Sequence, residues 1–308
     1  MDRILKCEID SALSGKTVKE ILKNRFKISS SVMTELKSSE DGVLLNGKKV
    51  FVNEKVSEGD NILITIRDLR SDIEESDIPL DVLYEDEDII AVNKGRSLPI
   101  HPSQNHHGDT LANAMMHYYA GERFTFRVIT RLDKDTSGVV LLAKNPLSGA
   151  ILSEQMKNGD IKKEYIAVTE GVPDVKKGII EAPIKRREES VILRCVAEDG
   201  KSAITEYEIL KEKDDCALIL LRPITGRTHQ IRVHLSHIGC PILGDGLYGS
   251  SKDDKTLLHC SKISFRHPIT DEIMEVKAPV PEDISREIQV DFKRTDIGRK
   301  NDYQEVLE

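Results

Sequence analysis

A cluster of charged residues that could do acid–base or nucleophilic chemistry stands early in the segment 129–144. Arg131, Asp133 and Asp135 fall within a stretch of five residues. A carboxylate can act as a nucleophile or a general base, and an arginine beside it can keep it charged or bind a phosphate group. The alternative is a surface loop whose charged side chains are simply solvated, and these residues alone favour neither interpretation.

The residues that follow this cluster predict the element that would hold it. Residues 136–138, Thr-Ser-Gly, are typical of a turn, and the apolar run 139–143 predicts a short buried strand. Charged side chains at the mouth of a buried strand are well placed to form a site, because the strand is rigid and the loop reaches solvent.

A second segment, residues 222–241, predicts a helix that carries basic side chains. Thr228 is placed to cap this helix, which a Gly-x-Pro sequence would end near residue 239. Arg232 lies three residues after His229 and four after Thr228, so the three side chains are expected to share one helix face.

Short apolar runs with tight turns between them fill most of the remaining chain. Strands are expected over residues 89–92, 164–169, 191–196, 203–210, 216–221, 257–260 and 263–265. Short helices are expected over residues 111–118 and 152–156. Successive strands joined by short turns predict an α+β fold with a mostly antiparallel mixed sheet.

Residues 1–70 have the pattern of a small α+β module. Thr17 is placed to cap one helix, a second helix follows Ser29, and the pair Asn46-Gly47 between short apolar runs predicts a hairpin. The module carries thirteen Lys and Arg against eleven Asp and Glu. These basic side chains could bind an RNA backbone or could simply be solvated, and charge alone favours the second interpretation.

The bulk composition limits the class of protein. With 308 residues, the chain is long enough for one large and one small domain, and its net charge is −8. Residues 71–88 hold nine acids and no base, so the acidity is partly local. No apolar run approaches the ~18 residues of a membrane span, and the N-terminus has no signal core. We therefore expect a cytoplasmic protein that does not bind a membrane.

The cysteines and histidines do not predict a metal site. The five cysteines are odd in number and widely spaced, which indicates reduced thiols. His106 and His107 are adjacent, so they point in different directions in most backbones.

The first 70 residues resemble the S-four-type RNA-binding domain, named after a small-subunit ribosomal protein. The resemblance rests on two short helices followed by DGVLLNGKKV and VNEKVSEGDNILI, in which a Gly-Asp turn precedes the last strand. It implies that this module binds RNA.

Residues from about 80 to 280 resemble the RluA-type RNA pseudouridine synthases. The family's His-Arg-Leu-Asp and Thr-Ser-Gly stand at residues 130–133 and 136–138, with Thr130 in place of the histidine. Three further motifs of the family are present in this chain. Residues 225–234 match Thr-Gly-Arg-x-His-Gln-Ile-Arg-x-His, residues 244–249 match Gly-Asp-x-x-Tyr-Gly, and residues 163–165 match Lys-Glu-Tyr. An early Val-Asn-Lys stands at residues 92–94.

The resemblance implies an isomerase that detaches a uracil base in RNA, turns it and rejoins it through carbon to the same sugar, without a cofactor or a metal. Asp133 would be the nucleophile or base, and Arg232 would hold it in a bidentate pair. Tyr165 would stack on the flipped base, with its hydroxyl free to assist proton transfer at carbon 5. The remaining site residues, expected to bind the substrate, are Arg131, Thr136, Arg227 and His229.

Two neighbours of these residues have no catalytic role in this interpretation. Thr130 stands beside Asp133, and the sequence offers no reason for a threonine there. Asp245 is expected only to hold its loop.

The predicted division of the chain is 1–70 as the RNA-binding domain, 71–82 as an acidic linker, 83–285 as the catalytic domain and 286–308 as a polar tail, in a monomer. Large-subunit ribosomal RNA is the first choice of substrate and tRNA the second, by analogy with synthases that carry such an added module. Two functions of other classes stay open: a non-catalytic RNA-binding assembly factor, and a glycosidase-type enzyme in which Asp133 and Asp135 flank one bond.

Overall fold

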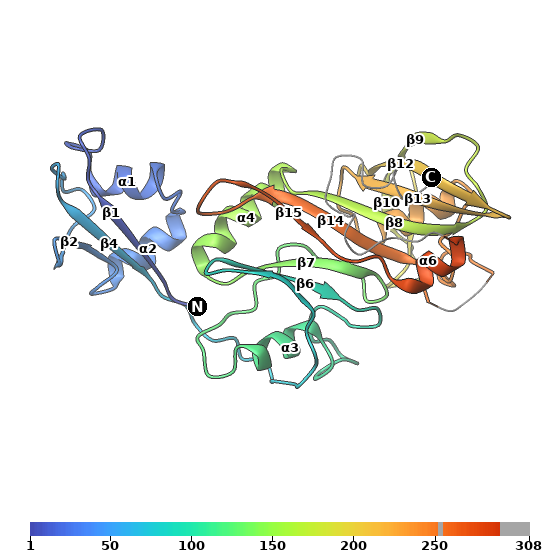
Figure 1. The fold of residues 1–308 in the computed structure, drawn as a ribbon, viewed down its shortest axis with the longest axis horizontal. Coiled ribbons are helices and arrows are strands. Elements are labelled where there is room, and N and C mark those ends of the chain that lie inside the picture. The colour runs from blue at the N-terminus through green and yellow to red at the C-terminus, as the bar shows by residue number, and fades with distance from the viewer. Residues whose placement is uncertain (252–254, 290–308) are drawn as a thin grey trace.

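The computed structural model of the chain describes residues 1–251 and 255–289. It contains a four-stranded sheet, a nine-stranded sheet and a two-stranded ribbon. In Figure 1 the N-terminal part lies at the left, and the larger part extends to the right along the long axis. None of the helices in the described ranges is both long and apolar enough to cross a membrane.

The N-terminal part is a small α+β unit with its own hydrophobic core. Its elements are β1 (Arg3–Glu8), α1 (Val18–Asn24), α2 (Ser30–Ser38), β2 (Val43–Leu45), β3 (Lys48–Lys49) and β4 (Asn61–Ile66), with the strand order β1-β4-β2-β3. Thr17 caps α1 in a capping box with Glu20, and Ser29 caps α2. Asn46 and Gly47 have φ angles of 51° and 78°, as a tight hairpin requires. The predicted cap at Thr17 and the predicted hairpin are confirmed.

The larger part is built on the nine-stranded sheet. Its strands are β5 (Val82–Glu85), β6 (Ile89–Lys94), β7 (Ser137–Ala143), β8 (Lys162–Glu170), β9 (Lys177–Glu181), β12 (Ile204–Lys213), β13 (Cys216–Pro223), β14 (Leu258–Arg266) and β15 (Ile273–Lys277). Their order is β5-β6-β7-β14-β8-β13-β12-β9, and β15 pairs with β14. Each pair is antiparallel except β7 with β14. The predicted α+β fold with a mostly antiparallel mixed sheet is confirmed.

Helices and a ribbon complete the larger part. They are α3 (Leu111–Tyr118), α4 (Pro146–Asn158), α5 (Gln230–His237), α6 (Glu282–Ile288) and the strands β10 (Ile184–Arg186) and β11 (Arg194–Val196). Helix α4 is longer than the predicted 152–156, because Asn145 caps it, Pro146 occupies its first turn and Gly159 ends it with φ 76°. The strand predicted over 191–196 is shorter, since pairing with β10 begins only at Arg194.

Strand β7 carries the segment of interest. All seven of its residues are buried, which confirms the buried strand predicted over 139–143. The strand begins earlier than predicted, because Ser137 and Gly138, expected in a turn, already pair with β14. At its start it runs parallel to β14, with Ser137 opposite His259 and Gly138 opposite Cys260. The Ser137 Oγ lies 2.9 Å from His259 Nδ1 in the buried interior. Gly138 has φ 115°, and a Cβ there would collide with the Cys260 backbone, so this close approach requires glycine.

A buried polar junction joins the two parts of the molecule. Arg3 of β1 donates from Nε and Nη2 to the two carboxylate oxygens of Asp88, at 3.0 and 2.9 Å. Asp88 also accepts a hydrogen bond from Ser148 Oγ at the start of α4, at 3.0 Å. The same helix contributes Leu147 and Ile151 to the core of the N-terminal part. In Figure 1, α4 accordingly lies at the side of the larger part that faces the N-terminal part.

The segment 71–82 packs on the larger part, although it has no helix or strand before β5. The N–H of Ser71 donates to the carbonyl of Phe124 at 3.0 Å, and the N–H of Ser76 donates to the carbonyl of Asn113 at 3.2 Å. Backbone hydrogen bonds therefore hold this acidic segment against the surface of the larger part.

The C-terminal helix α6 also packs on the larger part. Its Ile284 and Ile288 are fully buried, in a cluster with apolar residues of β8 and β13. The predicted polar tail, 286–308, therefore begins in a packed helix. Its residues 290–308 lie outside the described ranges.

Replacing Gly138 by alanine is expected to lower the free energy of unfolding by roughly 3 kcal/mol. The added Cβ would have to displace the Cys260 backbone, and alanine is strained at this φ. Urea unfolding followed by circular dichroism measures the loss. The control is Gly95→Ala, where a Cβ has nothing within 4 Å, and it should change the free energy by less than about 1 kcal/mol. Equal stability of Gly138→Ala and the parent protein would contradict the close pairing of β7 with β14.

Candidate active site

All seven residues singled out from the sequence line one cavity. Its volume is about 550 Å³, and it is bordered by the turn before β7, by β8 and by the segment that leads into α5. The seven are Asp133, Arg232, Tyr165, Arg131, Thr136, Arg227 and His229. A cavity of this size suits one small organic group.

Asp133 lies in the turn that precedes β7, with 28% of its side chain exposed. The backbone N–H of Thr136 donates to the Asp133 carbonyl at 3.2 Å and closes the turn. Lys94, at the end of β6, supports this turn from the interior. Its Nζ donates to three backbone carbonyls, those of Gly95, Leu98 and Lys134, at 2.8, 3.0 and 2.9 Å. Lys94 thus ties the loop after β6 to the loop that carries Asp133.

Lys94 is a buried cation, and the sequence indicated no role for it. Only 1% of the residue is exposed. Burial lowers its pKa to about 8, against the attraction of Asp135 and Asp133. It is still mostly protonated at neutral pH, so it places a positive charge beside the turn of Asp133.

Thr130, which stands where the resemblance implies histidine, serves the backbone. It is fully buried, and its Oγ1 accepts a hydrogen bond from the N–H of Leu141 in β7 at 2.9 Å. The N–H of Ile129 donates to the Leu141 carbonyl at 2.8 Å. The threonine side chain therefore fixes the segment before Asp133 to β7, which explains a residue that the sequence left unexplained.

The predicted bidentate pair between Arg232 and Asp133 is wrong. Arg232 donates from Nε and Nη2 to the two oxygens of Asp245, both at 2.7 Å, whereas its Nη1 lies 3.9 Å from Asp133 Oδ2. The side chains of Arg232 and Asp245 are 4% and 1% exposed, so each needs a partner in the interior. Burial alone would lower the pKa of Arg232, but the hydrogen bonds and charge of Asp245 raise it. Asp245 therefore does more than hold its loop.

His229 approaches the other oxygen of Asp133 from an unusual backbone conformation. Its Nε2 lies 4.0 Å from Asp133 Oδ1, and its Nδ1 lies 2.7 Å from the Tyr248 hydroxyl. His229 is the N-cap of α5, with φ 57° and no capping hydrogen bond from its side chain. The prediction that Thr228 caps this helix is wrong, because the chain turns left-handed at His229 before the helix begins at Gln230.

The expected substrate-binding residues differ in exposure. Arg131 is exposed, and Thr136 is 3% exposed. Arg227 is exposed, and its Nε donates to the carbonyl of Ser202 at 2.9 Å. The Gln230 Oε1 accepts the N–H of Arg227 at 2.9 Å and closes the turn before α5, in place of the predicted threonine cap.

Tyr165 forms part of the cavity wall on β8. It is 7% exposed and pairs with Cys260 of β14. Burial, with Cys260 and Asp133 nearby, raises the pKa of Tyr165 well above its usual value, so the hydroxyl stays protonated at neutral pH. Lys163, two residues earlier, lines the same cavity, and burial lowers its pKa.

Within the described ranges, Asp133 is the carboxylate that lines this cavity, and Asp135 does not line it. A mechanism with two carboxylates on either side of one bond is therefore not supported. A single carboxylate beside a guanidinium and an imidazole can act as a nucleophile or base on a group held against Tyr165.

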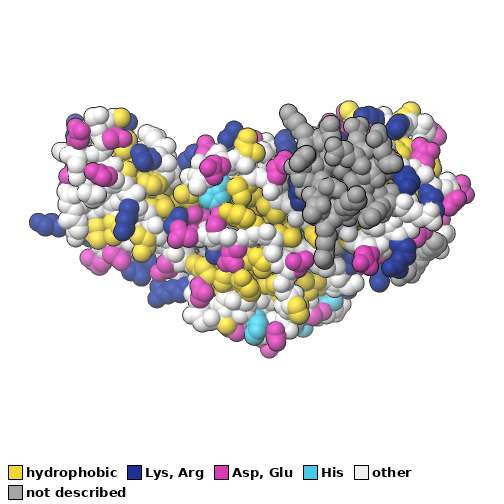
Figure 2. All heavy atoms as spheres, viewed as in Figure 1, with side chains coloured by type: hydrophobic (Ala, Val, Ile, Leu, Met, Phe, Trp, Pro, Cys, Tyr) yellow, Lys and Arg dark blue, Asp and Glu magenta, His cyan; other side chains and the backbone are white. Residues whose placement is uncertain are grey.

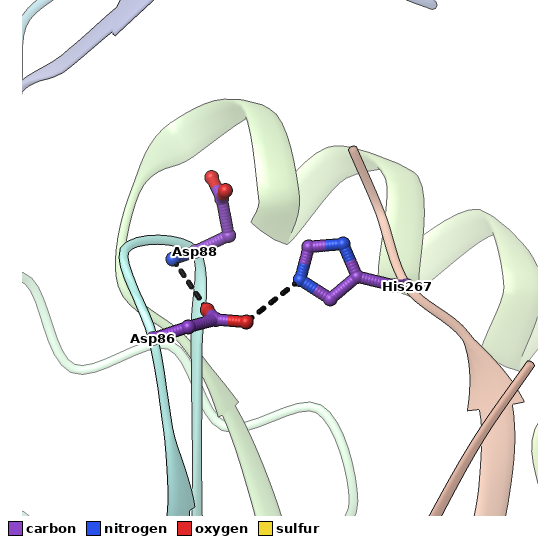
Figure 3. Close-up of side chains that lie close together, drawn as sticks. All are labelled: Asp86, Asp88 and His267. Atoms are coloured by element: carbon purple, nitrogen blue, oxygen red, sulfur yellow. Dashed lines mark hydrogen bonds and ion pairs between the residues drawn. The ribbon is translucent and has the colours of Figure 1, made fainter. Parts of the chain in front are cut away.

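Asp86, Asp88 and His267 lie close enough together to resemble a metal site (Figure 3). The Asp86 carboxylate accepts hydrogen bonds from His267 Nε2 at 2.9 Å and from the N–H groups of Asp88 and Ile89 at 2.7 and 2.8 Å. The Asp88 carboxylate binds Arg3. These groups are therefore engaged within the protein: Asp88 belongs to the junction between the two parts, and Asp86 joins the turn before β6 to the residue that follows β14.

Comparison with known proteins relates this geometry to one family. Residues 88–237 match the family model described as RNA pseudouridylate synthase. YjbO of Bacillus subtilis, named an uncharacterized RNA pseudouridine synthase, is 38% identical over 279 residues, which cover 89% of this chain and 98% of that protein. The ribosomal large subunit pseudouridine synthase D of Escherichia coli K12 is 37% identical over 268 residues, which cover 80% of this chain and 82% of that protein.

Solved structures agree with the sequence comparison. Human RNA pseudouridylate synthase domain containing 1 matches with a TM-score of 0.57 and 28% identity, over 66% of this chain and 84% of that one. Human RNA pseudouridylate synthase domain containing 4 matches with a TM-score of 0.56 and 25% identity, over 68% and 92%. The chain therefore belongs to the RNA pseudouridine synthases, a family of isomerases.

Proposed function

We propose that this protein converts uridines of structured ribosomal RNA to pseudouridine, with Asp133 as the reactive carboxylate. One observation carries the assignment of Asp133. In the part of the chain that the structure describes, Asp133 is the carboxylate that lines the cavity, and Arg232, His229 and Tyr165 lie in the other walls.

The reaction breaks the bond between uracil N1 and the ribose carbon C1′, turns the base, and joins its C5 to the same C1′. The proton on C5 leaves, and N1 ends protonated, so the product is an isomer. Asp133 acts as the nucleophile or the base, and the Arg232 guanidinium lies 3.9 Å from its Oδ2. Tyr165 packs against the base.

The target uridine must leave its stack to reach this cavity, at a cost of a few kcal/mol. Arg131 is exposed and lines the cavity, so it is placed to fill the vacated stack or to hold a phosphate. Thr136, Arg227 and His229 contribute the remaining polar contacts to the flipped nucleotide.

We also infer that residues 1–70 bind RNA as an S-four-type domain, attached to a catalytic domain of the RluA type. Lys19 and Lys23 are exposed one turn apart on α1. On the face shown in Figure 2, acidic side chains lie among the basic ones of this part. RNA binding there would therefore depend on complementary shape as well as on charge. Several acids of the run 71–88 are paired with bases within the protein, among them Glu85 with Lys144 and Asp88 with Arg3, and this pairing limits their repulsion of RNA.

Large-subunit ribosomal RNA is the first substrate we propose, in a cytoplasmic monomer, and tRNA is the second. Support comes from the likeness to ribosomal large subunit pseudouridine synthase D, most of whose length the chain covers. Mapping pseudouridines in total RNA from cells with and without the gene tests the choice. The expected result is loss of pseudouridine at one or more sites of large-subunit ribosomal RNA, and loss confined to tRNA would contradict it.

Asp133→Asn is expected to lower the rate of pseudouridine formation at least about a thousandfold, because an amide can neither attack nor accept the proton. Release of tritium from carbon 5 of labelled uridine in RNA measures the rate, and filter binding measures RNA affinity, which should be retained. Asp135→Asn is the matched control, since it removes the same charge from the same turn but lies outside the cavity lining, and it should lose far less rate. Full activity of Asp133→Asn would refute the assignment and leave the assembly-factor function open.

Replacing Lys19 and Lys23 by glutamine is expected to weaken RNA binding and to reduce the slope of log affinity against log salt by about 1.4 to 1.8, for two phosphate contacts. Filter binding over a salt series measures this slope. The control replaces Lys176 and Lys177, which lie at the start of the distant edge strand β9 and should leave the slope unchanged. Identical slopes for both variants would argue against RNA binding by α1.

A further inference from the structure

One loop between α5 and β14 holds both side chains that face Asp133. Asp245 binds Arg232 with two hydrogen bonds of 2.7 Å, and the Tyr248 hydroxyl binds His229 at 2.7 Å. Asp245 and Tyr248 are three residues apart, as are His229 and Arg232. From these two positions Arg232 Nη1 and His229 Nε2 approach different oxygens of Asp133, at 3.9 and 4.0 Å.

The hydrogen bonds of Tyr248 assign the tautomer of His229. The backbone N–H of Arg194 donates to the Tyr248 hydroxyl oxygen at 3.1 Å. Tyr248 is 9% exposed, and within residues 1–251 and 255–289 its O–H has no acceptor other than His229 Nδ1. The O–H therefore donates to Nδ1, which must be unprotonated. The proton of a neutral ring is then on Nε2, the nitrogen that faces Asp133.

The charges around His229 keep the ring neutral. Burial lowers the pKa of His229 and outweighs the attraction of Asp133, which would raise it. Arg232 and Arg194 also lower this pKa, and Asp245 raises it. At neutral pH the ring therefore presents an uncharged N–H group to the cavity.

The backbone at His229 indicates a functional constraint on the same ring. Its φ of 57° lies in the left-handed region, which is uncommon for residues other than glycine and costs free energy. Strain of this kind concentrates at functional sites. Here it accompanies a ring that has Tyr248 on one side and Asp133 on the other.

We propose that Tyr248 is a positioning residue, which holds His229 in the Nε2–H tautomer so that a neutral N–H donor faces the reactive carboxylate of Asp133. This rests on the proposed function and deepens it. The other tautomer would turn the Nε2 lone pair toward the carboxylate and repel it. An imidazolium would form an ion pair through Nε2 with Oδ1 of Asp133 and neutralise the charge that must react. A neutral donor faces Oδ1 of Asp133 at 4.0 Å and leaves the charge of the carboxylate in place.

Tyr248→Phe removes the hydroxyl and keeps the ring, whose centroid lies 5.0 Å from the guanidinium carbon of Arg232. The kcat for pseudouridine formation is expected to fall about tenfold, the effect of one hydrogen bond, while KM for RNA is unchanged. Nitrogen-15 NMR of the substrate-free protein should show His229 protonated on Nε2 in the parent and a mixture of tautomers in the variant. Tyr207→Phe, a change in a buried tyrosine of β12 outside the cavity lining, should alter neither measurement.

Three results would overturn the proposal: a parent ring protonated on Nδ1, an unchanged kcat in Tyr248→Phe, or a raised KM with kcat unchanged, which would assign Tyr248 to RNA binding. The tautomer is read without substrate. It therefore tests the role of Tyr248 even if Asp133→Asn shows that the proposed function is wrong.

His229 itself provides a second test that does not depend on the folding of Tyr248→Phe. The amide nitrogen of glutamine can reach the position of Nε2, so His229→Gln should keep about tenfold more kcat than His229→Ala. Equal rates in the two variants would show that no N–H donor is needed there and would overturn the proposal.

Discussion

The arrangement of this cavity depends on a buried ion pair that does not include Asp133, the proposed reactive group. Arg232 and Asp245 are almost fully buried and bind each other through two hydrogen bonds. Breaking such a pair typically costs about 3–5 kcal/mol, so Arg232 is held away from Asp133. At 3.9 Å the two charges still attract, by on the order of 4 kcal/mol before desolvation is counted. Asp133 thus has Arg232 as a cationic neighbour. Because Arg232 donates its hydrogen bonds to Asp245, the carboxylate oxygens of Asp133 stay available.

The turn of Asp133 is held in place by contacts from several elements. The Oγ1 of Thr130 accepts a backbone hydrogen bond of β7 on one side of Asp133, and Gly138 lets β7 approach β14 on the other. Lys94 joins the loop after β6 to the carbonyl of Lys134 within the turn itself. Three separate strands thus contribute to holding the turn of Asp133, which is the close positioning that the proposed role of Asp133 requires.

Local sequence patterns predicted most helices and strands. The features that the sequence did not predict depend on contacts between residues far apart in the chain. The cap at Thr17 and the hairpin at Asn46 depend on neighbours within a few residues, so their cause can be seen in the sequence itself. The seven site residues met in one cavity because their motifs belong to a known architecture, which spacing alone could not supply.

The partner of Arg232 shows where such reasoning fails. The sequence offered Arg232 two aspartates as partners, Asp133 and Asp245. The structure shows that Asp245 accepts both hydrogen bonds from Arg232. The role of Thr130 was hidden for the same reason, since its partner Leu141 lies on the far side of a turn. The start of α5 was predicted from cap chemistry, but Gln230 closes that turn instead.

The way the N-terminal part is attached bears on the kind of RNA that this enzyme would select. Helix α4 follows β7 directly, and its Leu147 and Ile151 enter the core of the N-terminal part. Arg3 and Asp88 add a paired contact at the same junction. If the N-terminal part binds RNA as proposed, this attachment would hold the bound RNA at a set distance from Asp133, whereas a flexible linker would allow many distances. Such a fixed distance favours RNA whose own fold separates the bound element from the target uridine by a constant length, and unstructured RNA lacks this property.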